Sequence, residues 1–121
     1  MGLKIQTITG SGGSSSNPYA YFQVGSSAAA GTFFAYAYGN SIQCYSSGYV
    51  GISGSSQLNT KVRHGTNGNP SESLYSTNGN TYLVINCTGA STCTITFSAS
   101  GPNQFQGTFI GWSSSSTSVP S

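Results

Sequence analysis

Residues 81–98 read TYLVINCTGASTCTITFS, and this stretch decides the fold class. Thr81 to Cys87 is the most apolar run of the chain. From residue 93 to residue 98, Thr and Ser alternate with Cys, Ile and Phe. A period of two is that of a β-strand, whose side chains point alternately to the two faces of a sheet. We therefore predict strands at 81–87 and 93–98, joined by a loop that returns one strand beside the other.

The rest of the chain repeats short alternating segments bounded by Gly, Asn and Pro, and no window has a useful length of helical periodicity. Further strands are predicted at Lys4–Thr9, Tyr19–Val24, Thr32–Tyr38, Ser41–Tyr45, Tyr49–Ile52 and Phe105–Trp112. The Asn-Gly pairs at 67–68 and 78–79 predict tight turns. About eight short strands indicate an all-β fold, and we favour an antiparallel, jelly-roll-like β-sandwich. An immunoglobulin-type domain fits less well, because Trp112 follows all three cysteines.

Composition divides the chain into three parts. Residues 1–17 form an N-terminal strand and a Ser/Gly-rich arm, residues 18–112 the β-sandwich domain, and residues 113–121 a Ser-rich C-terminal tail. The arm sequence SGGSSSN, residues 11–17, indicates a flexible link. A strand on such a link can pair within its own domain, which we favour, or with the edge of a neighbouring copy. The tail would be disordered in isolation.

Charged residues are scarce: Lys4, Lys61, Arg63 and Glu72 are the only four, whereas about a quarter of an ordinary domain is charged. The net charge of +2 is too small for nucleic-acid binding, which requires clustered cations. A neutral, hydroxyl- and amide-rich surface suits contact with copies of the chain or with sugars. No segment is predicted to span a membrane, and residues 1–10 have no apolar stretch of signal-peptide length.

The chain also lacks most catalytic side chains. It has no Asp and a single histidine, His64, so a Ser-His-Asp triad is impossible, and Glu72 would have to replace the acid. We interpret Lys61, Arg63, His64 and Glu72 as decorating one solvated loop. The sequence therefore predicts no enzyme, no cofactor and no metal site.

Partner contacts are predicted in two groups of residues. Lys61, Arg63 and His64 form the one basic cluster, which suits an acidic partner or an anionic glycan, although the exposed face of a strand is favoured. Tyr36, Tyr38 and Trp112 are candidate sugar-stacking platforms. A sandwich with little Leu and Ile needs aromatic residues inside, so we expect most of the aromatic side chains in the core.

Three cysteines rule out complete intramolecular pairing. Cys87 and Cys93 are separated by a short loop and are the candidates for a disulfide, with two buried thiols as the alternative. Cys44 is then left over, buried or linking neighbouring copies.

These properties favour a non-enzymatic structural subunit of a homo-oligomeric assembly. In composition the chain resembles phage capsid-decoration and fibre proteins, which implies a virion surface protein that decorates or cements a capsid or builds a tail fibre. Its partners would be copies of itself and a capsid shell or a cell-surface glycan, on a virion or an extracellular surface. The alternatives are an extracellular surface filament built by strand exchange and a glycan-binding, lectin-like β-module.

Overall fold

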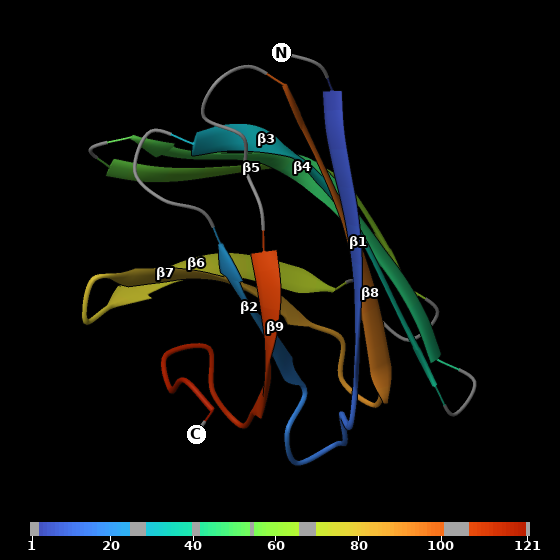
Figure 1. Cartoon of the computed structure of the whole chain (residues 1–121). Helices are drawn as coiled ribbons and strands as arrows, with labels where there is room; N and C mark the ends of the chain where they lie inside the picture. The colour runs from blue at the N-terminus through green and yellow to red at the C-terminus, as the bar shows by residue number, and fades with distance from the viewer. Residues whose placement is uncertain are drawn as a thin grey trace.

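The computed structural model describes residues 3–24, 29–39, 42–53, 55–65, 70–100 and 107–120. These residues form nine strands and no helix (Figure 1). The strands are β1 (Leu3–Ser11), β2 (Tyr19–Val24), β3 (Ala29–Gly39), β4 (Ile42–Ser53), β5 (Ser55–Gly65), β6 (Ser71–Thr77), β7 (Asn80–Asn86), β8 (Thr92–Ser100) and β9 (Gly107–Ser113).

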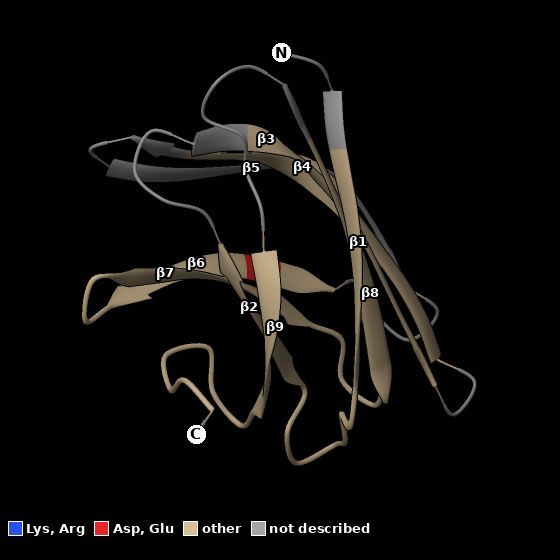
Figure 2. Cartoon of the chain, viewed as in Figure 1, with Lys and Arg blue, Asp and Glu red and all other residues tan. Residues whose placement is uncertain are grey.

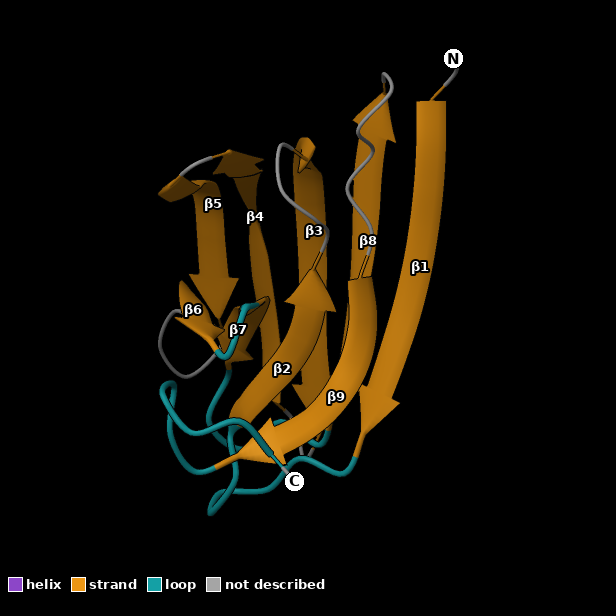
Figure 3. Cartoon of the chain, turned by 60° about the vertical axis from the view of Figure 1, so that its left-hand side comes forward, coloured by secondary structure: helices purple, strands orange, loops and turns teal. Residues whose placement is uncertain are grey.

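Two antiparallel sheets pack face to face (Figure 3). Sheet A has the strand order β1-β8-β3-β4-β5, and sheet B has the order β6-β7-β2-β9. The predicted all-β sandwich is therefore confirmed. β1 pairs with β8, and β2 pairs with β7. Strands from the start of the chain thus pair with strands from its end, as they do in a jelly roll. The strands β3, β4 and β5 do not continue this pattern. They form a meander, in which β3 pairs with β4 and β4 pairs with β5.

Three strand predictions need correction. The segments predicted at 41–45 and 49–52 are parts of the single strand β4. The predicted strands leave out β6 and most of β5, because few apolar residues alternate along them, and each is held by pairing with a neighbour. The strand favoured for Lys61, Arg63 and His64 is confirmed, since all three residues belong to β5. β7 and β8 do not lie side by side, since β7 belongs to sheet B and β8 to sheet A.

The core lies between the two sheets and is built from the alternate residues of each strand. Ala20, Phe22 and Val24 of β2 point into it, as the alternation predicts, and so do Ile95 and Phe97 of β8. The other face of β2 carries Tyr21. The Asn78-Gly79 turn between β6 and β7 is confirmed, with φ of 52° and 79° at the two residues. The turn predicted at 67–68 lies outside the described residues.

The N-terminal arm is held in place instead of forming a flexible link. β1 pairs with β8 of its own chain from Leu3 to Ser11. The backbone N–H groups of Gly12 and Gly13 both donate to the Ser91 carbonyl, at 2.9 and 3.0 Å. A Cβ added at Gly13 would lie 2.7 Å from Cζ3 of Trp112, so the arm lies directly against the indole. The prediction of a flexible arm missed these contacts, since they join residues far apart in sequence.

The C-terminal tail is likewise ordered and covers the outer face of sheet B. The hydroxyl of Tyr21 donates to the Ser115 carbonyl at 2.7 Å and accepts from the Ser118 backbone N–H at 3.0 Å. Val119 packs on the cluster of Tyr21, Tyr82 and Val84. Figure 1 shows the tail coiled beside β2 and β9. These contacts explain why a Ser-rich segment is fixed in the folded chain.

The predicted disulfide is wrong: Cys87 pairs with Cys44, and Cys93 is a buried free thiol. Cys44, Ala37 and Cys93 are register partners on β4, β3 and β8, which places the two candidate partners of Cys87 about 10 Å apart along sheet A. Gly89, two residues after Cys87, lies against Ile42 of β4. The loop starts near β4, so Cys44 is the cysteine within reach. The bond joins the two sheets.

Candidate binding surface

The outer face of sheet A is open, in contrast to the tail-covered outer face of sheet B. All four of the large hydrophobic side chains that are exposed in the described residues lie on it: Ile5 (60% exposed), Phe34 (47%), Tyr49 (41%) and Tyr38 (38%). The register brings these side chains together with rows of hydroxyl groups from β1, β8 and β4. This combination defines the candidate binding surface, which is the outer face of β1, β8, β3 and β4.

A threonine ladder occupies the β1 and β8 side of this surface. Thr7 and Thr96 are register partners whose hydroxyl oxygens lie 3.1 Å apart. Thr9 and Thr94 repeat the arrangement one step along, with 2.9 Å between their hydroxyl oxygens. Cross-strand hydroxyl pairs of this kind stabilise a sheet and leave an uncharged, weakly polar face.

An aromatic row occupies the middle of the surface. Tyr36 stacks on Tyr38 with ring centroids 5.0 Å apart and on Tyr45 with centroids 5.1 Å apart. Phe34 stacks on the other side of Tyr45, at 6.1 Å. The planes of each pair are within 26° of parallel, so the rings cover one another's faces. Tyr36 and Tyr45 lie inside the row with a ring on either side, and Phe34 and Tyr38 form its two ends.

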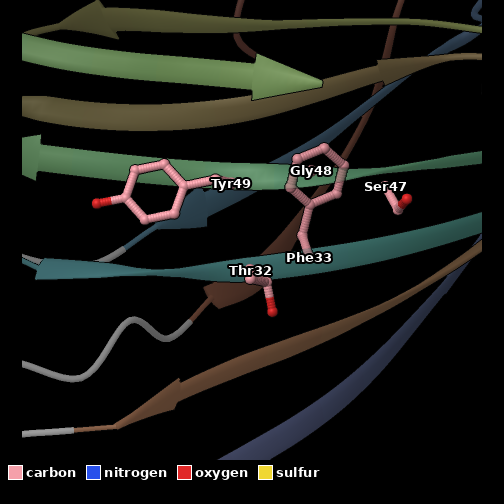
Figure 4. A pocket seen from close by; sticks show the side chains of 5 residues that line it. All are labelled: Thr32, Phe33, Ser47, Gly48 and Tyr49. Carbon is pink, nitrogen blue, oxygen red and sulfur yellow. The ribbon is translucent and has the colours of Figure 1, made fainter. Parts of the chain in front are cut away.

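A shallow hollow lies beside the aromatic row (Figure 4). Its volume is about 350 Å³, and it is lined by Thr32 and Phe33 of β3 and by Ser47, Gly48 and Tyr49 of β4. Phe33 is a buried core residue, and its register partner Gly48 has no side chain to fill the space beside it. Among the described residues, those that line the hollow offer hydroxyls and aromatic surface, and none of them is Lys, Arg, His, Asp or Glu.

The predicted sugar-stacking residues separate in the structure. Tyr36 and Tyr38 lie on this surface, but each is stacked on a neighbouring ring. Trp112 is half-buried against the core, beside Phe109, and its Nε1 is buried without a hydrogen-bond partner. The expectation that most aromatics fill the core is wrong for Tyr36, Tyr38, Tyr45 and Tyr49, which point outward. Alternation along β3 and β4 predicts a shared face but not which face is inside.

The predicted basic cluster lies on a strand at the edge of sheet A. Tyr45 is the register partner of His64, and Ser46 of Arg63, while Lys61 falls at the bulge of β5. The side chains of these three residues lie outside the described part of the structure.

The interpretation of one solvated loop is therefore wrong, since Glu72 belongs to β6 in the other sheet (Figure 2). The Glu72 carboxylate accepts a hydrogen bond from Ser46 Oγ at 2.5 Å, and Ser46 is buried. The chain's one acidic side chain thus links the two sheets instead of facing solvent.

Chemically reactive groups are few among the described residues. No group of three His, Cys, Asp or Glu side chains is placed to hold a metal there. Burial raises the pKa of the Cys93 thiol to about 12, so the thiolate needed for nucleophilic attack is not formed near neutral pH. Within the same ranges, no helix has the length and hydropathy needed to cross a membrane.

Comparisons with protein-family models, with curated proteins and with solved structures find no match for this chain.

Proposed function

We propose that the chain is a non-enzymatic structural subunit of a homo-oligomeric assembly, and specifically a phage or virion surface protein of the capsid-decoration or tail-fibre kind. The observation that supports this best is the open edge of β1. Sheet A ends on this strand, which is nine residues long and pairs with β8 without a bulge. A long, regular edge strand with few charges is a template for pairing with another chain.

The other three edge strands carry features that oppose pairing. β5 has a bulge in its ladder with β4 and contains Lys61 and Arg63, and β6 contains Glu72. β9 has a bulge in its ladder with β2, and its Gly107 N–H is already taken by Gln6 Oε1 at 2.9 Å. β1 contains no Pro and a single charged residue, Lys4, next to its first position. Copies of the chain would therefore join through β1, by adding strand to strand.

Main-chain pairing between nearly uncharged surfaces has a predictable salt dependence. With four charged side chains in the whole chain, association gains and loses little from screening. Light scattering of the purified chain should show a particle larger than the monomer, with the same mass at about 0.05 M and about 1 M salt. A monomer at every concentration, or dissociation by salt alone, would contradict the proposal.

The edge itself is tested by adding charge to it. Ile5 and Thr7 are exposed on the outer face of β1, so the double variant Ile5→Lys/Thr7→Lys should fold normally. Like charges placed opposite each other in a ladder destabilise it, and we expect the assembly to fall to monomer. The matched control is Ser16→Lys/Thr88→Lys, which adds the same charge at exposed positions away from β1. Equal assembly of both double variants would show that β1 is not the contact.

A further inference from the structure

We propose that the hollow beside Tyr49 binds one ring of a neutral glycan. This would give the subunit an adhesive function beyond assembly. The two functions use separate parts of the molecule: Tyr49 lies on β4, three strands from the β1 edge, or about 14 Å away across the sheet. A chain joined to its neighbours through β1 would still present the hollow to solvent.

Tyr49 has the geometry of a stacking platform. A Cβ added at Gly51 would lie 3.2 Å from both Cε1 and Oη of Tyr49, so the tyrosine ring lies along its own strand, over the glycine. Figure 4 shows the ring extended along β4 beside the hollow. The side chain is 41% exposed. The strand supports one face of the ring, and the other face is available for the apolar C–H face of a sugar.

The neighbouring aromatic side chains belong to the stacked row, and none of them lines the hollow. Tyr36 and Tyr45 each stack on two rings, and Phe34 and Tyr38 end the row with one stacking partner each. Within the described part of the chain Tyr49 makes no ring–ring contact, which distinguishes it from the other outward-facing tyrosines. Exposure does not separate the two tyrosines, because Tyr38 is almost as exposed as Tyr49; their places do, since Tyr49 lines the hollow and Tyr38 lies at the end of the aromatic row.

Hydroxyl groups at the rim supply the polar contacts that a sugar needs. The Thr32 hydroxyl donates to the Ser98 carbonyl at 3.4 Å and keeps its lone pairs for an incoming donor. Ser47 also lines the hollow, and its hydroxyl makes no hydrogen bond within the described residues. Sites for small molecules combine an apolar platform with a few such polar groups, in volumes of roughly 300–1,000 Å³. The hollow, at about 350 Å³, is at the small end of this range, which suits one or two rings.

The charge of the residues that line the hollow indicates which class of glycan would bind. None of the described residues that line the hollow is Lys, Arg, Asp or Glu. A sialylated or sulfated sugar would lose hydration of its anionic group, and none of the described lining residues offers a cation in return. The ligand expected here is therefore an uncharged hexose or N-acetylhexosamine.

The test is binding of the wild-type chain to an array of neutral and acidic glycans, followed by titration of the best neutral ligand. We expect Tyr49→Ala to weaken binding at least tenfold and Tyr49→Phe to change it less than threefold, since the platform remains. Gly51→Ala should weaken binding, because its Cβ would push the ring away from the strand. Tyr38→Ala is the matched control, with similar exposure and a stacked ring, and should bind as the wild type does.

Three results would overturn the proposal, provided that circular dichroism shows each variant folded. They are no binding of any neutral glycan at millimolar concentration, binding of acidic glycans only, and equal losses in Tyr49→Ala and Tyr38→Ala. Light scattering of Tyr49→Ala distinguishes this proposal from the assembly proposal. The variant should keep the wild-type particle mass while it loses the sugar.

Discussion

At the scale of single residues, the Tyr21 hydroxyl is the polar group that fastens the tail to sheet B. Tyr21 is fully buried, and its oxygen serves both as donor to Ser115 and as acceptor from Ser118. Burial raises the pKa of the Tyr21 phenol, although the Ser118 hydrogen bond acts in the opposite direction. A neutral phenol is therefore required for this arrangement.

Replacing Tyr21 by Phe should lower the free energy of unfolding by about 1–2 kcal/mol at pH 7, because two hydrogen bonds are lost while the ring stays in place. The pH dependence has a definite sign. Since the folded-state pKa is raised, the stabilisation is complete below pH 10, the unfolded value, and is lost as pH rises through the folded pKa.

Urea denaturation of both proteins at neutral and alkaline pH measures this difference. Tyr75→Phe is the control, because Tyr75 packs on the same cluster and no hydrogen bond of its hydroxyl is found in the described residues. A Tyr21→Phe variant as stable as wild type at pH 7 would show that the tail is held by packing alone.

At the scale of elements, the Cys44–Cys87 bond connects β4 of one sheet to the end of β7 in the other. Its partners are 43 residues apart in sequence. Cross-linking a loop of that length removes a large number of unfolded conformations. The remaining cysteine, Cys93, is completely buried within the same core cluster and has no access to solvent.

The double variant Cys44→Ala/Cys87→Ala should lose about 4 kcal/mol of unfolding free energy on the loop-entropy estimate. Denaturant titration in the absence of reductant gives this value. In the native wild type, Cys93 should resist alkylation at pH 8 and react only after unfolding, because burial raises its pKa to about 12. Rapid labelling of one thiol in the native protein, or a second disulfide partner by mass spectrometry, would contradict this pairing.

At the scale of the whole molecule, the two outer faces differ in what covers them. The chain's own tail covers sheet B, whereas the aromatic and threonine face of sheet A is left open. β1 completes sheet A through contacts with β8 that a strand from another copy could also make, since they are main-chain pairs and hydroxyl pairs. The alternative assembly by strand exchange can therefore be tested directly.

Thr7→Cys/Thr96→Cys places two thiols at register partners whose hydroxyls lie 3.1 Å apart. After oxidation, a non-reducing gel should show a covalent monomer, because β1 pairs within its own chain and the arm is fixed by Gly12 and Gly13. A ladder of covalent oligomers would instead establish exchange of β1 between copies. The single variants Thr7→Cys and Thr96→Cys control for cross-links formed by collision.

The sequence by itself determined the strands with a clear apolar pattern and the tight turn at Asn78-Gly79. The strands β2, β3 and β8 follow from the period of two, and β7 follows from its continuous apolar run. The Asn78-Gly79 turn follows from the positive φ that glycine tolerates. Scarcity of charge also follows from composition alone, and with it the expectation of a neutral surface. Each of these properties depends on neighbouring residues only.

The tertiary structure alone decided the partners. Contacts between residues far apart in sequence decide which sheet each strand joins. They also decide which cysteine pairs with Cys87 and which face of β3 lies outside. The same holds for the arm and the tail, which are polar enough to be disordered and are ordered by Ser91, Trp112 and Tyr21. Tyr49 differs from Tyr38 for the same reason: alternation places both outward, and only the folded packing puts Tyr49 at the hollow and Tyr38 against the ring of Tyr36.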